Sequence, residues 1–257
     1  MTAKGRIAAL LPPLLPLIFC IGLAEMAVRL GWVPSYLIPA PSEVFRSLVD
    51  DRIELASAAW ETLSSALVGL LLSFFAGTLF SMALSSSDLA RRAFYPYAVF
   101  FQTVPIISIA PLLVIWFGFG RPTVIASAAI VSVFPIIAST LLGLKSTEPA
   151  LLDLFKLYSA TGRQTLWMLR IPFALPQIFS GLRIASGLAV VGAIVGEFIG
   201  GGGLGSVVDS ARTQQRIDRV FAAVLISSIL GIVLVGAINF VSALSLGSWH
   251  ASERKPS

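Results

Sequence analysis

Formal charges are missing over long intervals of this 257-residue chain, and these gaps limit its fold more than any other feature. A helix needs about 20 apolar residues to cross a bilayer, and the longest gap, residues 220–252, holds 33 residues without a formal charge. With 56% hydrophobic and 12% charged residues, the chain has about half the charge of a water-soluble domain. Lipid must therefore surround much of its surface. A disordered chain is excluded, because disorder requires low hydrophobicity.

The uncharged or nearly uncharged intervals predict six transmembrane helices in an all-α, polytopic membrane protein. Only helices and closed barrels satisfy backbone polar groups in hydrocarbon, and none of the intervals alternates as barrel strands do. The predicted spans, within a single domain over residues 1–257, are about 7–30, 61–84, 94–119, 122–144, 175–199 and 220–246. The first span also resembles a secretory signal peptide, because Lys4 and Arg6 precede it. We favour a retained helix there.

The basic residues predict the orientation and the absence of some partners. With the N-terminus inside, ten Lys and Arg residues lie on the inner side and seven on the outer side, with Arg183 inside the fifth span. The positive-inside rule then places both termini in the cytoplasm. Basic loops beside anionic lipid account for the net charge of +5, so no nucleic-acid partner is expected. With one cysteine and one histidine, no metal or other cofactor is predicted.

The loop at 145–174, between the fourth and fifth spans, has the pattern of a helical hairpin. Apolar residues recur at helical spacing, a break follows near Ser159–Gly162, and a second helical stretch leads to Pro172 and Pro176, which disfavour its undisturbed continuation. Two interpretations fit this pattern. The hairpin lies on the lipid surface, or its first helix presents an apolar stripe to a groove on a soluble partner.

The order of residues in this loop resembles a known family. From Asp153 to Pro172 the chain is similar to the cytoplasmic "EAA" loop of bacterial ABC importer permeases, which reads Glu-Ala-Ala, three residues, Gly, nine residues, Ile-x-Leu-Pro. Asp153 takes the place of Glu, Leu154 and Phe155 those of the two Ala, and Ser159 that of Gly. Leu169, Ile171 and Pro172 then take the Ile, Leu and Pro places.

Other segments resemble one subfamily, the permeases for nitrate, sulfonate, taurine and related compounds. Residues 105–120 look like its third-helix signature, and residues 37–44 look like its first outer loop. Leu175-Pro176, Gly181–Ile184 and the run from Gly196 to Gly205 resemble its fifth-helix region. The matches run in order over about 37–240.

This resemblance implies a function and a set of partners. It implies the permease subunit of an ATP-driven importer in the bacterial inner membrane, which moves a small solute of the nitrate, sulfonate, taurine, pyrimidine or thiamine-precursor type inward by alternating access. Two permeases pair in such an importer, an ABC ATPase subunit docks on the inner loop, and an extracytoplasmic substrate-binding protein delivers the cargo. The implied coupling residues are Leu151, Asp153, Leu154, Phe155, Lys156, Tyr158, Ser159 and Arg163.

Small and polar residues within the spans have more than one interpretation. Gly69, Ser73, Gly77 and Ser81 recur every four residues, and Gly192 and Gly196 form GxxxG, so backbones can approach closely there. We favour packing inside one subunit over a subunit or gate interface. Prolines in the third span predict a kink, so Gln102, Thr103 and Ser108 are candidate pathway residues. Glu197 is a fourth candidate, because ionisable groups at membrane depth are often functional, although a helix end at the headgroups is the simpler expectation.

Two other classes of function, an enzyme and a secondary transporter, lack support in the sequence. Residues 200–205 satisfy GxGxxG, but a membrane helix precedes them where a dinucleotide site needs a strand, and no GxxxxGK[ST] motif is present. No pair of catalytic groups is visible at membrane depth, as an intramembrane enzyme needs. No matched halves with broken helices point to a secondary transporter. The chain is therefore predicted not to be an enzyme itself.

Overall fold

The computed structural model describes residues 3–246, without the side chains of residues 3–14 and 17. Within this range every regular element is a helix. Residues 1–2 and 247–257, the two ends of the predicted domain, lie outside this range. The long helices are α1 (Ala3–Arg29), α3 (Arg52–Ser85), α6 (Arg121–Lys145), α9 (Ile171–Gly200) and α11 (Ile217–Leu246). The shorter elements are α2 (Pro41–Asp50), α4 (Asp88–Thr103), α5 (Ile106–Phe117), α7 (Pro149–Leu157), α8 (Gly162–Thr165), the π-helical turn η1 (Leu166–Arg170) and α10 (Gly203–Thr213). The all-α prediction is confirmed.

Four helical segments are long and apolar enough to cross a membrane, namely α3, α6, the continuous stretch Gly162–Gly200 and α11. A fifth crossing requires α4 and α5 to count as one span, although they meet at an angle of 99°. The predicted third span, 94–119, is divided into two helices by a break at Val104–Pro105, and the kink that its prolines predict is this 99° bend. Helix α1 occupies the first predicted span, but it is not among these four or five candidate crossings. A count of six spans is therefore not confirmed.

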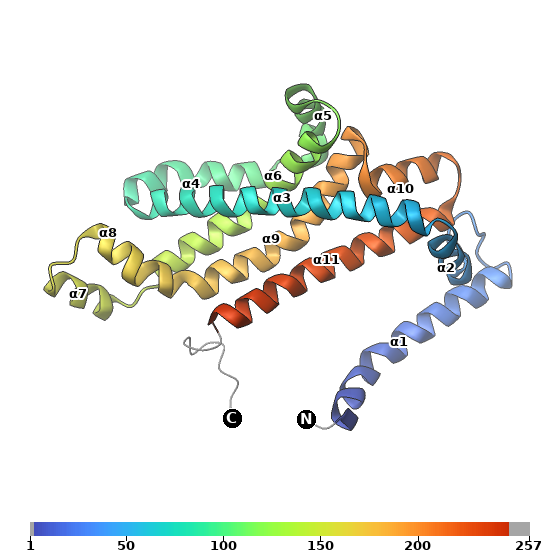
Figure 1. Cartoon of the computed structure of the whole chain (residues 1–257), viewed down its shortest axis with the longest axis horizontal. Coiled ribbons are helices and arrows are strands. Elements are labelled where there is room, and N and C mark those ends of the chain that lie inside the picture. The colour runs from blue at the N-terminus through green and yellow to red at the C-terminus, as the bar shows by residue number, and fades with distance from the viewer. Residues whose placement is uncertain (1–2, 247–257) are drawn as a thin grey trace.

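Helices α3, α6, α9 and α11 run side by side along the long axis of the molecule (Figure 1). One end of this bundle, the hairpin end, carries α7 and α8 and the turns at 86–87 and 145–148. The other, the cap end, carries α2, α10, the segment 31–40 and the turn at 214–216. Helix α1 contacts the rest of the chain at the cap end, where the Glu25 carboxylate accepts hydrogen bonds from the Ser42 amide (3.0 Å) and hydroxyl (2.7 Å). Figure 1 shows α1 leaving the bundle at an angle from that point.

Small side chains bring α6 close to α3 and α9 in the centre of the bundle. A Cβ atom at Gly192 would lie 2.8 Å from the Ala128 Cα atom, and one at Gly69 would lie 2.6 Å from the Ala128 Cβ atom. Buried serines add hydrogen bonds between the helices: the hydroxyls of Ser73 and Ser132 are 2.7 Å apart, and the Ser127 hydroxyl donates to the Gly192 carbonyl at 2.6 Å. Packing within one chain, the favoured interpretation of the small-residue pattern, is confirmed.

Candidate docking hairpin and transport pathway

Helix α7 presents most of its apolar side chains to solvent at the hairpin end. Leu157 and Tyr158 are 82% and 80% exposed, and Leu154 is 45% exposed. Of the other residues predicted for this helix, Leu151 and Phe155 are half-buried, and Asp153 and Lys156 form an exposed ion pair of 2.8 Å. The exposed apolar stripe thus consists of Leu154, Leu157 and Tyr158, which follow the i, i+3, i+4 spacing of one helix face.

A well-formed C-terminal cap ends α7 at Ser159. The Ala160 amide donates to the Phe155 carbonyl (3.0 Å) and the Ser159 amide to the Lys156 carbonyl (2.9 Å), the two bonds of a Schellman motif. Ser159 has a φ of +52°, the left-handed conformation that glycine adopts most easily. Ser159 therefore occupies the place that the resemblance gives to glycine, and it also adopts the conformation that glycine favours.

The second helix of the hairpin begins with a capping box that the sequence analysis did not use. The Thr161 hydroxyl accepts from the Gln164 amide (3.3 Å), and the Gln164 side chain accepts from the Thr161 amide (2.8 Å). The spacing Thr-x-x-Gln is a sequence signal for such a start. Beside this cap lies a shallow pocket of about 380 Å³, lined by Thr161, Arg163, Gln164, Trp167 and Met168. Trp167 and Met168, which follow α8, add two more exposed apolar side chains to the hairpin end.

The second helix continues into the membrane without a gap. Helix α8 passes through the π-helical turn η1 at Leu166–Arg170 into α9, so that Gly162–Gly200 forms one segment. Pro172 follows directly after this turn. The predicted disturbance at Pro172 thus takes the form of a wider helical turn just before it. Helix α8 is therefore continuous with α9, which packs against α3 and α6 in the hydrophobic core.

Three of the four candidate pathway residues gather at the break between α4 and α5. Gln102 and Thr103 end α4, and Ser108 lies in the first turn of α5; all three are exposed. The stretch 93–120 around them contains no formal charge. The break therefore presents neutral hydrogen-bonding groups.

Glu197, the fourth candidate, lies at the cap end and is 1% exposed. Its Oε2 atom accepts from the Gly205 amide (2.8 Å), while Glu61 and Thr62 of α3 accept from the Gly203 (3.0 Å) and Leu204 (2.9 Å) amides. These three acceptors satisfy the free N–H groups in the first turn of α10. The expectation that Glu197 faces the headgroups is wrong, because its side chain is buried and its partner, the Gly205 amide, lies in α10 beyond the glycine turn.

The glycine run 200–205 connects two helices and not a strand and a helix. Gly201, Gly202 and Gly203 have φ values of +84°, +88° and +59°, which L-amino acids with side chains rarely adopt. A Cβ atom at Gly203 would also overlap the Glu197 carboxylate. Glycine is thus required here for a tight turn over two carboxylates, and the dinucleotide interpretation is excluded.

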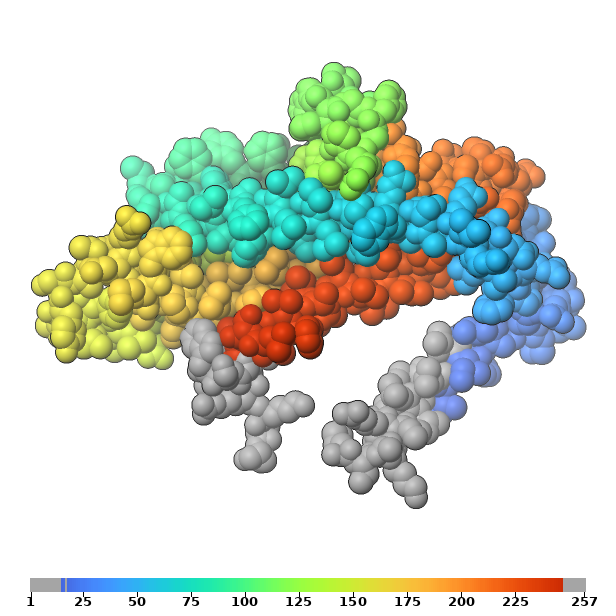
Figure 2. Space-filling model, viewed as in Figure 1, coloured from blue at the N-terminus to red at the C-terminus, as the bar shows by residue number. Residues whose placement is uncertain are grey.

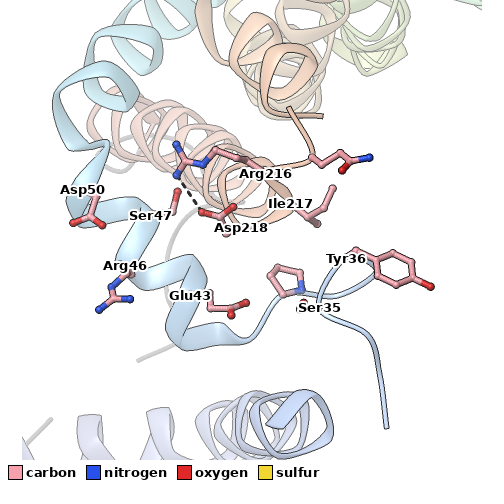
Figure 3. Close-up of a pocket in the computed structure, with 11 residues that line it drawn as sticks. Ser35, Tyr36, Glu43, Arg46, Ser47, Asp50, Arg216, Ile217 and Asp218 are labelled. Carbon is pink, nitrogen blue, oxygen red and sulfur yellow. Dashed lines mark hydrogen bonds and ion pairs between the residues drawn. The ribbon is translucent and has the colours of Figure 1, made fainter. Parts of the chain in front are cut away.

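A polar pocket of about 390 Å³ opens at the cap end between α2 and the start of α11 (Figure 3). Arg216 on its wall donates to Asp51 (2.8 Å) and Asp218 (3.2 Å). Burial raises the pKa of Asp51, but hydrogen bonding and charge from Arg216 outweigh it, so the pKa lies below the usual value for an aspartate. Arg219 adds a contact to Asp51 (3.9 Å) and a short one to Glu54. These ion pairs join α11 to the junction of α2 and α3.

Comparisons with known proteins agree with this arrangement. Residues 69–244 match the family model described as "Binding-protein-dependent transport system inner membrane component". A probable ABC transporter permease protein of Haemophilus influenzae is 36% identical over 90% of this chain and 95% of its own length. The formylaminopyrimidine transport permease protein ThiX of Halalkalibacterium halodurans is 38% identical over 84% of this chain and 86% of its own.

A taurine transport permease of Escherichia coli is more distant, with 28% identity over 83% of this chain and 80% of its own length. Among solved structures, a chain from inward-facing crystals of the MetNI methionine ABC transporter aligns with a TM-score of 0.65. Its identity is 19%, and the alignment covers 74% of this chain and 95% of that one, so it supports the fold alone. The chain belongs to the binding-protein-dependent inner membrane component family and is the permease subunit of an ABC importer, which works with a separate ATPase subunit and a substrate-binding protein.

Proposed function

We propose that α7 and α8 form the docking hairpin for the ATPase subunit and that residues 1–257 act as one permease domain with both termini on the cytoplasmic side. Leu151, Leu154, Phe155 and Tyr158 supply apolar contact, with Leu157 and Trp167 added by their exposure. Asp153, Lys156 and Arg163 surround them as charged groups, and Ser159 sets the turn. Aromatic side chains anchor interfaces when they fill pockets on a partner, and an amphipathic helix places its apolar face in a groove on the partner.

The observation that carries this proposal is the helical continuity of the hairpin with α9. A displacement of α8 by the nucleotide cycle of the partner passes through η1 into α9. Because α9 packs closely on α6 and α3, the three helices tilt together. Tilting of a packed block between two arrangements is sufficient for alternating access.

Substitutions on α7 test the docking role. Leu157→Asp, Phe155→Asp and Asp153→Arg should abolish ATP-driven uptake and copurification of the ATPase subunit, while the amount of permease in the membrane stays unchanged. Tyr36→Asp is a matched control, because Tyr36 is an exposed aromatic residue at the cap end and should leave ATPase copurification intact. Normal copurification with all three hairpin variants would contradict the proposal.

The chain itself is proposed to hydrolyse no ATP. The support is the missing phosphate-binding motif. Reconstituted vesicles provide the test: the permease alone should show neither ATP hydrolysis nor uptake, and both should begin when the ATPase subunit and the binding protein are added. Uptake by the permease alone would instead indicate a secondary transporter.

We infer that the cargo is a neutral pyrimidine-type precursor, taken through a pathway lined by Gln102, Thr103 and Ser108. Two observations support this choice. The relative for formylaminopyrimidine is 38% identical, against 28% for the taurine relative, and the α4–α5 break has amide and hydroxyl groups but no charge for an anion. We assign Glu197 a structural role, because its carboxylate lies beside Gly203 and accepts from the Gly205 amide at the start of α10.

Ligand binding by the cognate substrate-binding protein tests the cargo directly. Calorimetry with pyrimidines, taurine, an alkanesulfonate and nitrate should give binding with the pyrimidine alone. Gln102→Leu should then reduce uptake of that pyrimidine several-fold without changing ATPase copurification. Binding of a sulfonate or nitrate and not of a pyrimidine would overturn the cargo assignment and leave the docking proposal intact.

A further inference from the structure

Arg183 carries a charge near the middle of α9, where a membrane solvates charge least well. It lies 12 residues after Ile171 and 17 residues before Gly200, which is about 18 Å and 26 Å along the helix axis. A hydrocarbon layer about 30 Å thick, centred on this helix, leaves Arg183 about 11 Å from its nearer edge. This distance is longer than an arginine side chain, so the guanidinium does not reach the headgroups.

No carboxylate of this chain lies at the depth of Arg183. Acidic residues are absent from 1–24, 62–87, 89–147, 154–196 and 219–252, and these intervals include the middle of every long helix. Glu197 is 14 residues further along α9, a distance of about 21 Å. Within the described residues 3–246, no acidic side chain pairs with Arg183. A further copy of the chain has the same gaps and offers no partner at this depth.

The face of α9 around Arg183 is open and partly polar. Gln177 and Arg183 are exposed, and Ser180 between them is half-buried. A Cβ atom at Gly187, one turn further on, would meet nothing within 4 Å. Figure 2 shows part of α9 at the surface between α3 and α11. The guanidinium therefore has free space beside it and polar neighbours on the preceding turns.

A charge with no ionic partner and no access to headgroups requires water. Ionisable side chains within membrane helices face the bundle interior or a water-filled cavity for this reason. We propose that Arg183 faces the water-filled transport path and forms an electrostatic barrier that keeps Na⁺, K⁺ and protons from leaking through it. The proposal rests on the permease function, which supplies such a path. A fixed positive charge between low-dielectric walls repels cations, whereas a neutral cargo meets no such barrier.

Ion flux through the assembled importer tests this barrier. Vesicles that contain the permease, its ATPase and the binding protein are supplied with ATP and a pyrimidine, and the entry of sodium, chloride and pyrimidine is measured in parallel. Arg183→Gln should raise sodium entry about tenfold, as expected for one unit charge that acts over about 10 Å at an effective dielectric constant of about 20. Chloride entry should not rise, because the lost charge does not repel anions. Arg183→Lys keeps the charge and should stay tight. Arg46→Gln is the matched control, because Arg46 is an exposed arginine on α2 at the cap end.

A charge added chemically at the same position separates the barrier from a folding defect. In a Cys20→Ser background, the Arg183→Cys importer should leak sodium. A water-soluble methanethiosulfonate that attaches a trimethylammonium group to the new thiol should stop this leak, and one that attaches a sulfonate should not. Modification by either reagent also requires that water reaches position 183.

Each outcome decides the proposal. A leak selective for sodium in Arg183→Gln, with tight Arg183→Lys and Arg46→Gln importers, supports it. Equal leaks of sodium and chloride, a leak in Arg183→Lys as large as in Arg183→Gln, or a thiol at 183 that neither reagent modifies overturns it. An Arg183→Gln importer that stays tight also overturns it, and a loss of pyrimidine uptake in that importer would assign Arg183 to cargo binding instead. Uptake by the parent importer in the same vesicles leaves the permease function standing in all these cases.

Discussion

The two ends of the bundle hold their polar side chains in different ways. At the cap end, Glu197 and Arg219 are buried. Carboxylates of α3, α9 and the α2–α3 junction hold the amides of α10 and the two arginines at the start of α11, Arg216 and Arg219. At the hairpin end, Asp153 and Lys156 pair only with each other and are exposed. Buried polar groups cost more to disturb than exposed ones. The cap end is therefore built to hold its arrangement, and the hairpin end to meet another molecule.

A glycine at each end allows the largest test of this difference. Gly203→Ala places a methyl group over the Glu197 carboxylate at a φ of +59°, and left-handed strain with overpacking should cost about 2–4 kcal/mol. Gly162→Ala meets nothing within 4 Å at the hairpin end and should leave stability unchanged. Thermal unfolding in detergent, with the folded amount in membranes, measures both. Equal melting temperatures of the two variants would contradict the conclusion that the cap end is built to hold its arrangement.

Two threonine caps give the next largest expected difference. Thr62→Val removes the acceptor for the buried Leu204 amide, and a buried N–H without a partner should cost about 1–3 kcal/mol. Thr161→Val removes the cap of α8, but water reaches the Gln164 amide, so the global loss should be below about 0.5 kcal/mol. The same unfolding measurement separates them. A larger loss from the Thr161 variant would reverse the comparison.

The charge pattern predicted the helices well, because desolvation of charge is what limits a membrane span. The charge pattern locates the membrane-embedded part of a helix and not the ends of the helix. Helix α3 therefore begins at Arg52, nine residues before the predicted span at 61, and its first charged residues lie at the cap end. Prolines predicted the disturbance of the third span. Its 99° angle depends on how α5 packs on α6, through the buried Leu113 of α5 and the Thr123 hydroxyl of α6, and local sequence does not contain that information.

The docking hairpin and Glu197 also show that local sequence does not contain information on tertiary packing. Helical spacing predicted the hairpin. Of the coupling residues expected on it, Leu151 and Phe155 are half-buried, and the exposed Leu157 was not among them, because the spacing does not say which face the rest of the chain covers. The burial of Glu197 depends on a turn packed beside Glu61 and Thr62, and the amides that these two residues hold lie 142 residues away in sequence. Contacts of that range leave no local pattern.

A smaller effect is expected from glycine substitutions at Ser159 and Gln215, the residues other than glycine that have positive φ in the described range 3–246. Ser159 has a φ of +52° at the hairpin end, and Gln215 has a φ of +59° at the cap end. Replacement by glycine relieves strain in the folded state but increases the entropy of the unfolded chain, so the net gain should be about 0.5 kcal/mol. Gln215→Gly should raise the unfolding temperature slightly, whereas Ser159→Gly should only slow local amide exchange at 158–160. A global shift from Ser159→Gly alone would show that the hairpin unfolds with the core.

The smallest effect should appear on acidification of the cap end. Because the pKa of Asp51 is lowered in the folded chain, its ionised form adds stability above the unfolded value of 3.8, and this is lost as the pH falls through the folded pKa. Arg216 remains partly exposed, so the contribution should stay below about 1 kcal/mol. Asp51→Asn should lower the unfolding temperature at pH 7, and this loss should become smaller as the pH falls below 3.8. Asp153→Asn at the hairpin end should do neither, because its ion pair with Lys156 is exposed and joins residues of one helix. An Asp51 variant as stable as the parent at pH 7 would mean that the ion pairs of the cap end add nothing to the hydrogen bonds that hold α10.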